Sequence, residues 1–185
     1  DEYYEQDMRI RRELRLWVAG NSPYSEAPYG TFAERRQEAL VAAARCRGEL
    51  YADIARMALG QWADVEPEPT LSVIARVDRE EDGAADLVAL LGMQHRFGQH
   101  SSFPACLRQP LEACILGYPY PDPDTADDAL DSHALLWATA AILAGQLYPG
   151  HTFPCVGVSG RELRERAERR VLRCLRQRGS WGLPE

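Results

Sequence analysis

The sequence predicts an all-α protein. Apolar residues recur at intervals of three and four along several segments, which is the spacing that places them on one face of a helix. Two helix starts have the spacing of a capping box, with Thr31 followed by Glu34 and Ser159 followed by Glu162. The only candidate strand, "FPCVGV" at 153–158, is short. These observations favour antiparallel helical hairpins, arranged as a bundle, a solenoid or part of an α/α toroid.

Length and composition define the expected domain organisation. The chain has 185 residues, enough for one domain with a core, and 45% of them are hydrophobic, unlike a disordered chain. We predict a partly helical N-terminal extension over 1–30 and a single helical domain over 31–185. Because the sequence begins at Asp1 without a methionine and ends on "SWGLPE", we expect it to be a fragment of a larger toroid.

We predict six or seven helices joined by short loops that contain proline and glycine. The first helical spacing begins at Thr31 and continues past Gly48 to Met57, where the two prolines of "ADVEPEPT" interrupt it. A short helix over 71–77 follows. A longer helix over 87–97 ends at a glycine.

Three further helices complete the predicted domain. One spans 107–118, and Pro110 is expected either to kink it or to mark its start. A helix over 132–147 is apolar all round, so we expect it to be buried as the inner helix of a two-layer structure. The last helix runs from Ser159 to Gly179, and its interleaved arginines and glutamates are typical of a solvated face.

Charge and cysteine usage argue against several functional classes. The net charge of −7 is opposite to the basic surface that a general nucleic-acid or anionic-membrane binder needs. No run reaches the ~18 apolar residues of a membrane span, and no signal peptide is visible, so we predict a cytoplasmic protein. The five cysteines are never closer than eight residues apart, which is not the spacing of a zinc site. We therefore predict buried, reduced thiols that act as small hydrophobic residues, no metal and no cofactor.

The most acidic segment is "DPDTADDALD" at 122–131, with five aspartates in ten residues. Asp127, Asp128 and Asp131 form a D-D-x-x-D pattern, in which carboxylates can hold Mg²⁺ and a diphosphate. That chemistry needs a preceding apolar helix and a second acidic box, whereas a proline-rich loop precedes this segment. The alternative is a helix start, where aspartate caps the helix and complements its dipole. The residues favour the cap, and diphosphate chemistry stays as an alternative function.

His133 follows at the first turn of the apolar helix. An imidazole titrates near neutral pH, so it can act as a general base where the helix start opens onto a cleft. The alternative is a histidine in the cap region that hydrogen bonds to nearby backbone. The chemistry of the residue by itself favours this simpler role.

Two long stretches resemble a known family. The run "DSHALLWATAAILAGQLYPGHTF" followed by "SGRELRERAERRVLRCLRQRGSWGLPE" is similar to a family of large bacterial proteins. These have an acidic-Asn-His segment, an apolar helix ending in "LAGQL-P" and a "TG-EHRERA" helix. The upstream stretches "LSVIARVDREEDGAADLVALLGMQHRFG" and "LEACILGYPY" resemble the family's preceding helices. The resemblance covers roughly 70–185 and is most specific at 131–150. The family itself resembles α/α-toroid carbohydrate-active enzymes of the heparinase and alginate-lyase type.

The resemblance implies β-elimination or hydrolysis on an acidic polysaccharide. In such lyases an asparagine or a similar group neutralises the uronate carboxylate, a histidine or tyrosine removes the C5 proton, and a tyrosine can protonate the leaving oxygen. Asp131 and His133 match the acidic and histidine positions, which implies that Asp131 orients His133 as the base. Tyr118 and Tyr120 match an aromatic pair before the loop, which implies a proton donor or a platform for a sugar ring.

Two positions depart from the family pattern. Ser132 replaces the amide that could bind a carboxylate, and Ala134 replaces a polar residue. Either the chemistry differs here or the site is degenerate. We expect Ser132 and Trp137 to contact a polysaccharide or oligosaccharide substrate, and we expect neither nucleic acid nor membrane as a partner. The alternative from another class is a non-catalytic helical interaction module.

Overall fold

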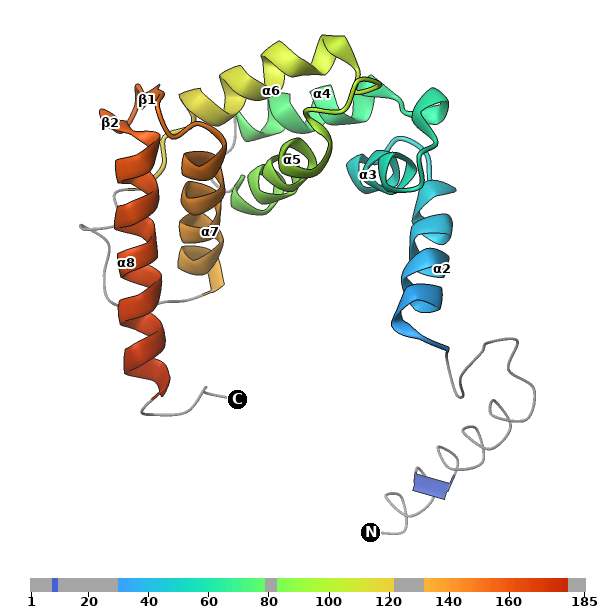
Figure 1. Cartoon of the computed structure of the whole chain (residues 1–185), viewed down its shortest axis with the longest axis horizontal. Coiled ribbons are helices and arrows are strands. Elements are labelled where there is room, and N and C mark those ends of the chain that lie inside the picture. The colour runs from blue at the N-terminus through green and yellow to red at the C-terminus, as the bar shows by residue number, and fades with distance from the viewer. Residues whose placement is uncertain (1–7, 10–29, 79–82, 122–131, 180–185) are drawn as a thin grey trace. The chain divides into compact units, whose positions relative to one another are not determined.

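The computed structural model describes residues 8–9, 30–78, 83–121 and 132–179 (Figure 1). The chain divides into two compact units, and each is described by itself. Unit 1 comprises Asp1–Arg47 and Tyr51–Asp64, and unit 2 comprises Gly48–Leu50 and Val65–Glu185. Two compact units can belong to one domain, so the predicted single domain over 31–185 stays a prediction.

Helices dominate the described residues, so the all-α prediction is confirmed. The arrangement as part of an α/α toroid stays a prediction. In the described part of the chain, no helix is both long and apolar enough to cross a membrane. The elements in chain order are α2 (Phe32–Ala44), α3 (Leu50–Ala58), the 3-10 helix η1 (Trp62–Asp64), α4 (Pro67–Val77), α5 (Ala84–Phe97), α6 (Ala105–Gly117), α7 (Ser132–Leu147), β1 (Thr152–Phe153), β2 (Val158–Ser159) and α8 (Gly160–Gly179).

In unit 1, α2 begins with the predicted capping box. The backbone N–H of Glu34 donates to Thr31 Oγ1 at 3.3 Å, and the backbone N–H of Thr31 donates to Glu34 Oε2 at 2.8 Å. The prediction that helical structure continues past Gly48 is wrong, because α2 ends at Ala44. Gly48 has a φ of +72°, a left-handed conformation that interrupts an α-helix and that glycine adopts most readily.

A buried arginine joins the end of α2 to α3. Arg56 Nη1 lies 2.8 Å from Asp53 Oδ1, and both side chains are almost completely buried. The same guanidinium donates from Nε to the carbonyl oxygen of Ala44 at 3.2 Å and from Nη2 to that of Cys46 at 2.7 Å. Carbonyl groups at a helix end have no partner within their own helix, so Arg56 satisfies polar groups that the end of α2 leaves open.

Unit 2 is built from α4 to α8 and a short hairpin. Within it α4 contacts α5 and α6, α5 contacts α7, and α7 contacts α8. Figure 1 shows α7 and α8 side by side and antiparallel. The large apolar side chains that are completely buried in its core come from α5, α6, β1 and α8: Leu87, Leu90, Leu91, Leu107, Leu111, Ile115, Phe153 and Leu163.

α6 contains Pro110 in its interior. The helix begins at Ala105, so the expectation that this proline marks the helix start is wrong. A proline at this position has no N–H to donate to the carbonyl group four residues earlier. Burial of Leu107, Leu111 and Ile115 against the core offsets that loss, because tertiary packing supplies most of the stability of a helix in a folded protein.

α7 occupies the predicted range, but the prediction that it is buried all round is wrong. Its alanines at 138, 140, 141 and 144 are buried, whereas Leu135 is 42% exposed and Leu136 is half-buried. Close packing explains the choice of small residues. A Cβ atom added at Gly145 would lie 2.3 Å from the carbonyl oxygen of Gly160, so α7 and α8 approach too closely there for a larger side chain.

The segment after α7 is a two-stranded antiparallel hairpin. Thr152 pairs with Ser159 and Phe153 pairs with Val158. The candidate strand over 153–158 is therefore wrong, because only its two ends are extended. Its middle is a turn, in which the backbone N–H of Gly157, at a φ of +75°, donates to Phe153 O at 2.8 Å. Ser159 Oγ then accepts from the backbone N–H of Glu162 at 3.3 Å and caps α8.

Candidate functional site

The predicted site residues fall into two groups in the structure. Asp127, Asp128 and Asp131 lie outside the described residues. Ser132 and His133 are the first two residues of α7, and the structure describes their positions on the helical backbone. The predicted orientation of His133 by Asp131 therefore stays a prediction.

The other three predicted residues come together in one cluster of rings. We call Tyr118, Tyr120, Trp137 and Phe153 the aromatic cluster. Tyr118 and Tyr120 follow the end of α6, Trp137 lies on α7 and Phe153 lies on β1. The ring centroids are 5.1 Å apart for Tyr118 and Trp137, 5.3 Å for Tyr118 and Tyr120, and 5.6 Å for Tyr120 and Phe153. Aromatic rings attract one another at such separations, so the cluster holds α6, α7 and the hairpin together.

Tyr120 anchors the aromatic cluster to the end of α6. Its side chain is buried, and its hydroxyl donates to the carbonyl oxygen of Ile115 at 2.9 Å. Burial, and then the nearby Cys114, Tyr118 and Tyr148, raise the pKa of Tyr120 above its ordinary range. The hydroxyl therefore stays protonated and donates a hydrogen bond to a backbone carbonyl group. The alternative role of Tyr120 as a proton donor to substrate stays a prediction.

Trp137 is the member of the aromatic cluster that reaches the surface. It is half-buried, whereas Tyr118 is 6% exposed and Phe153 is completely buried. The planes of Trp137 and Tyr118 make an angle of 24°, so the two rings are stacked. His133 precedes Trp137 by four residues on α7, and positions four apart lie on the same side of a helix. The backbone position of His133 therefore lies on the same side of α7 as Trp137, one turn earlier.

Two more titratable groups lie near the aromatic cluster. Burial, and to a lesser degree Asp78, raise the pKa of Cys114 to about 12. At neutral pH Cys114 is therefore a thiol, which is a poor nucleophile. Burial and Glu112 also raise the pKa of Tyr148, whose hydroxyl oxygen lies 3.5 Å from Gln94 Nε2. Neither group has the lowered pKa of an activated nucleophile.

Metal binding finds no support in the described residues. Among them, no group of three or more histidine, cysteine, aspartate or glutamate side chains is arranged to hold a metal ion. The described histidine side chains make other contacts: His95 Nε2 lies 3.0 Å from Leu143 O, His100 Nδ1 accepts from the backbone N–H of Ser102 at 3.1 Å, and the ring of His151 lies edge-on to Tyr148.

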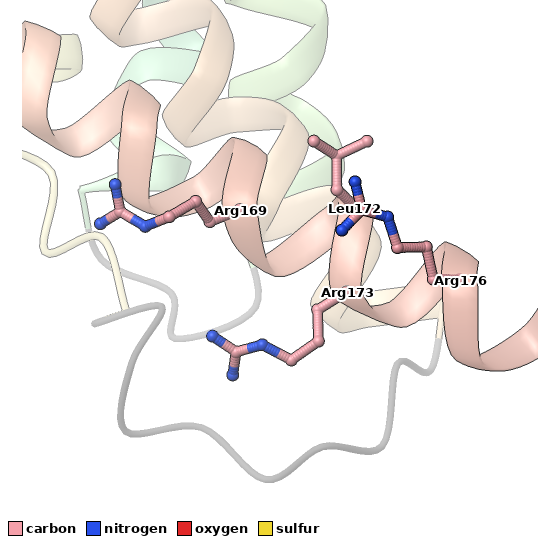
Figure 2. Close-up of a pocket in the computed structure, with 4 residues that line it drawn as sticks. All are labelled: Arg169, Leu172, Arg173 and Arg176. Carbon is pink, nitrogen blue, oxygen red and sulfur yellow. The ribbon is translucent and has the colours of Figure 1, made fainter.

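α8 contains a feature that sequence analysis interpreted only as a solvated face. That interpretation holds for its first half, where Arg164 pairs with Glu168 and Arg166 pairs with Glu162, each at 2.5 Å. Beyond Glu168 the helix has no acidic residue. Among the described residues, the side chains that line a pocket of about 480 Å³ here all come from this half of α8, and Figure 2 shows them along the helix: Arg169, Leu172, Arg173 and Arg176.

Sequence reasoning missed two parts of this arrangement. Phe153 was assigned to a short candidate strand, and no local pattern links it to residues more than 30 positions earlier. The separation of charge along α8 did have a signal, because its three glutamates all precede Arg169. Counting charges over the whole helix conceals that signal.

The chain was compared with protein-family models, with curated proteins and with solved structures, and none of the three comparisons found a match. Membership of a family is therefore not shown. The functional proposal depends on the side chains described above and on the resemblance in sequence.

Proposed function

We propose that this chain is the helical part of a carbohydrate-active protein, which binds an acidic polysaccharide at the first turns of α7 and cleaves it by β-elimination or hydrolysis. The observation that carries the proposal is the half-buried Trp137, stacked on Tyr118 and one helical turn beyond His133. An accessible aromatic ring can bind the apolar face of a sugar, and a histidine one turn earlier can supply the base that β-elimination needs.

The aromatic cluster supports the proposed sugar platform. Stacking on the buried Tyr118 limits the rotation of the Trp137 ring, and Tyr118 is in turn packed edge-on against Tyr120. A ring held in place by packing loses little conformational entropy when a ligand binds. Trp137 therefore offers a preorganised surface to the apolar face of a sugar ring.

In the proposed elimination, His133 takes the C5 proton of a uronate residue. The electron pair of that C–H bond forms the C4–C5 double bond while the C4–O bond breaks. The leaving oxygen takes a proton from water, because the side chains of Tyr118 and Tyr120 are buried. Ser132 stands where the resembling family has an amide, so its hydroxyl is the proposed contact to the uronate carboxylate. Hydrolysis is the alternative in which the C1–O bond of the glycosidic linkage breaks, water adds its hydroxyl to C1 and its proton to the leaving oxygen, and no double bond forms.

The test measures cleavage and binding separately on a panel of uronate polymers, with the full chain described here. Ultraviolet absorbance of the unsaturated product reports elimination, a reducing-end assay reports either reaction, and calorimetry reports binding. We expect His133→Ala to lower turnover by about 10²-fold or more while binding is retained. We expect Trp137→Ala to weaken binding by about tenfold, equivalent to about 1.4 kcal/mol.

Trp62→Ala is the matched control, because Trp62 is also a half-buried tryptophan but lies on η1 in unit 1. It should leave both cleavage and binding unchanged. The proposal is wrong if no uronate polymer binds to the wild-type chain, or if Trp62→Ala weakens binding as much as Trp137→Ala does. Binding without cleavage would mean a degenerate site that has kept only its sugar platform.

The cytoplasmic location also stays a proposal. It is supported by the cysteines, since all those whose side chains the structure describes are free thiols: Cys46, Cys106, Cys114 and Cys155. The prediction that the thiols are buried holds for Cys114 and is wrong for the other three, which are exposed. Free thiols are typical of a reducing compartment. Cell fractionation with an antibody to the chain would test it, and recovery from an oxidising compartment would contradict it.

A further inference from the structure

The second half of α8 has a surface that neither the fold nor the proposed sugar chemistry uses. We call Arg169, Leu172, Leu175 and Arg176 the α8 docking face. The opposite side of the helix is buried, because Leu163 and Ala167 are completely covered and α8 packs against α7. The α8 docking face therefore points away from the core of unit 2.

The apolar members of this face are unusually exposed for leucines. Leu172 is 51% exposed and Leu175 is 54% exposed, and they lie three positions apart on neighbouring turns. Single exposed apolar residues are common on protein surfaces. Two such residues side by side, in a part of the helix that contains arginines and no acidic residue after Glu168, are instead characteristic of a surface that contacts a partner.

The arginines by themselves have a simpler explanation. Cations near the C-terminal end of a helix interact favourably with its dipole, so Arg173 and Arg176 could be there for the stability of α8. This explanation does not account for Leu172 and Leu175, which gain nothing from the dipole. It also does not account for Arg169, which lies in the middle of the helix. A partner that is both acidic and apolar accounts for all four side chains.

We propose that the α8 docking face binds an acidic, amphipathic peptide segment of a partner protein. The apolar side chains of that segment would cover Leu172 and Leu175, and its carboxylates would pair with Arg169 and Arg176. Guanidinium groups form short, charge-assisted hydrogen bonds with carboxylates, and helical segments with an apolar stripe are a common ligand of apolar surfaces. This inference does not depend on the proposed sugar chemistry, because the α8 docking face and the aromatic cluster share no residue.

Two other partners fit the surface less well. A bare polyanion would use the arginines but leave both leucines in water. A helix that lies on a membrane buries a wide apolar face in the lipid. The wide apolar side of α8, which contains Leu163 and Ala167, is already packed inside unit 2. The combination of a narrow apolar stripe and flanking cations favours a peptide.

The experiment is fluorescence anisotropy with the full chain and a dye-labelled peptide of leucine and glutamate. The peptide is about 18 residues long, or about five helical turns, with leucines at every third and fourth position. Polyglutamate, polyglucuronate and phosphatidylglycerol vesicles are tested in parallel. We expect the leucine–glutamate peptide to bind at least about tenfold more tightly than polyglutamate, and its affinity to fall with added salt.

Charge and apolar contact are then separated by variants. Arg169→Glu with Arg176→Glu should weaken peptide binding by about tenfold or more, and Leu172→Ala with Leu175→Ala should weaken it by several-fold. The matched control is Arg36→Glu with Arg47→Glu, which changes the net charge equally through two exposed arginines of unit 1. It should leave peptide binding unchanged.

Several results would overturn the inference. Equal binding of polyglutamate or polyglucuronate would mean that the face recognises charge alone, and preferential binding to vesicles would identify a lipid surface. Loss of binding in the control would indicate a non-specific effect of net charge. Peptide binding that appears only after the five aspartates of 122–131 are changed to asparagine would identify that segment as the occupant instead. Absence of any peptide binding would also overturn it.

Discussion

The aromatic cluster and the α8 docking face differ in how the chain builds them. The aromatic cluster collects four rings from the end of α6, from α7 and from β1, and three of these rings are buried. The α8 docking face comes from two turns of a single helix, and its leucines are exposed. The cluster is therefore part of what stabilises unit 2, whereas the docking face contributes little to the fold. Substitutions should separate stability from binding at the docking face, but not within the buried part of the cluster.

The largest expected effect is at Phe153. Its side chain is completely buried and packs against Tyr120, so Phe153→Ala removes a ring and leaves a cavity. We expect the free energy of unfolding to fall by about 3–5 kcal/mol, measured by urea denaturation. Leu172→Ala on the docking face should change it by less than about 0.5 kcal/mol. Similar losses at the two positions would contradict the distinction between a stabilising cluster and a docking face.

The second effect is a loss of stability at alkaline pH, caused by Cys114, which lies near the aromatic cluster. The folded state raises the pKa of Cys114 from 9.0 to about 12, so between these values the folded thiol keeps a proton that the unfolded thiol has lost. The free energy of unfolding should therefore have its full value below pH 9. It should fall as the pH rises towards 12, by up to about 1.4 kcal/mol per pH unit. Denaturation curves measured across this range would show the slope.

Cys114→Ala is the control for the alkaline effect, because it removes the thiol and leaves the neighbouring tyrosines. Its slope between pH 9 and about 10 should be shallower than that of the wild type. Cys155→Ala, at an exposed cysteine, should leave the slope unchanged. An unchanged slope in Cys114→Ala would show that another group is responsible.

The smallest effect concerns the two halves of α8. Arg164 pairs with Glu168 on a partly exposed surface, so Arg164→Ala should lower the free energy of unfolding by only about 0.3–0.5 kcal/mol, and less at high salt. Arg176→Ala should have no larger effect on stability, yet it should weaken the binding of the leucine–glutamate peptide. Thermal melts at low and high salt, combined with the anisotropy assay, would show whether the two halves have these separate roles.

Several features of the fold could be predicted because they depend on neighbours in the sequence. The start of α2 follows from Thr31 and Glu34, whose side chains satisfy backbone groups three residues apart. The range of α7 follows from a largely apolar stretch without proline, which lies between the aspartate-rich segment and Pro149. The interruption at Gly48 was missed, because a glycine is compatible with a helix interior and only its positive φ shows that the helix stops.

The candidate site could be predicted in part. Tyr118, Tyr120 and Trp137 were selected from the sequence, and the structure brings these three into contact. The contribution of Phe153 could not be predicted, because the hairpin that carries it follows α7 and returns to the end of α6 only in three dimensions. For Asp131 and the side chain of His133, the predicted roles stay predictions.

The sequence by itself determined the helical class, most of the helix boundaries and the separation of charge along α8. These depend on interactions between residues a few positions apart, which are the same wherever the helix lies. Only the tertiary structure decided which side of α7 is buried, which rings meet in the aromatic cluster and which leucines of α8 stay exposed. Helical spacing defines the faces of a helix, but a face becomes buried only when another segment covers it, and that depends on packing between residues far apart in the chain.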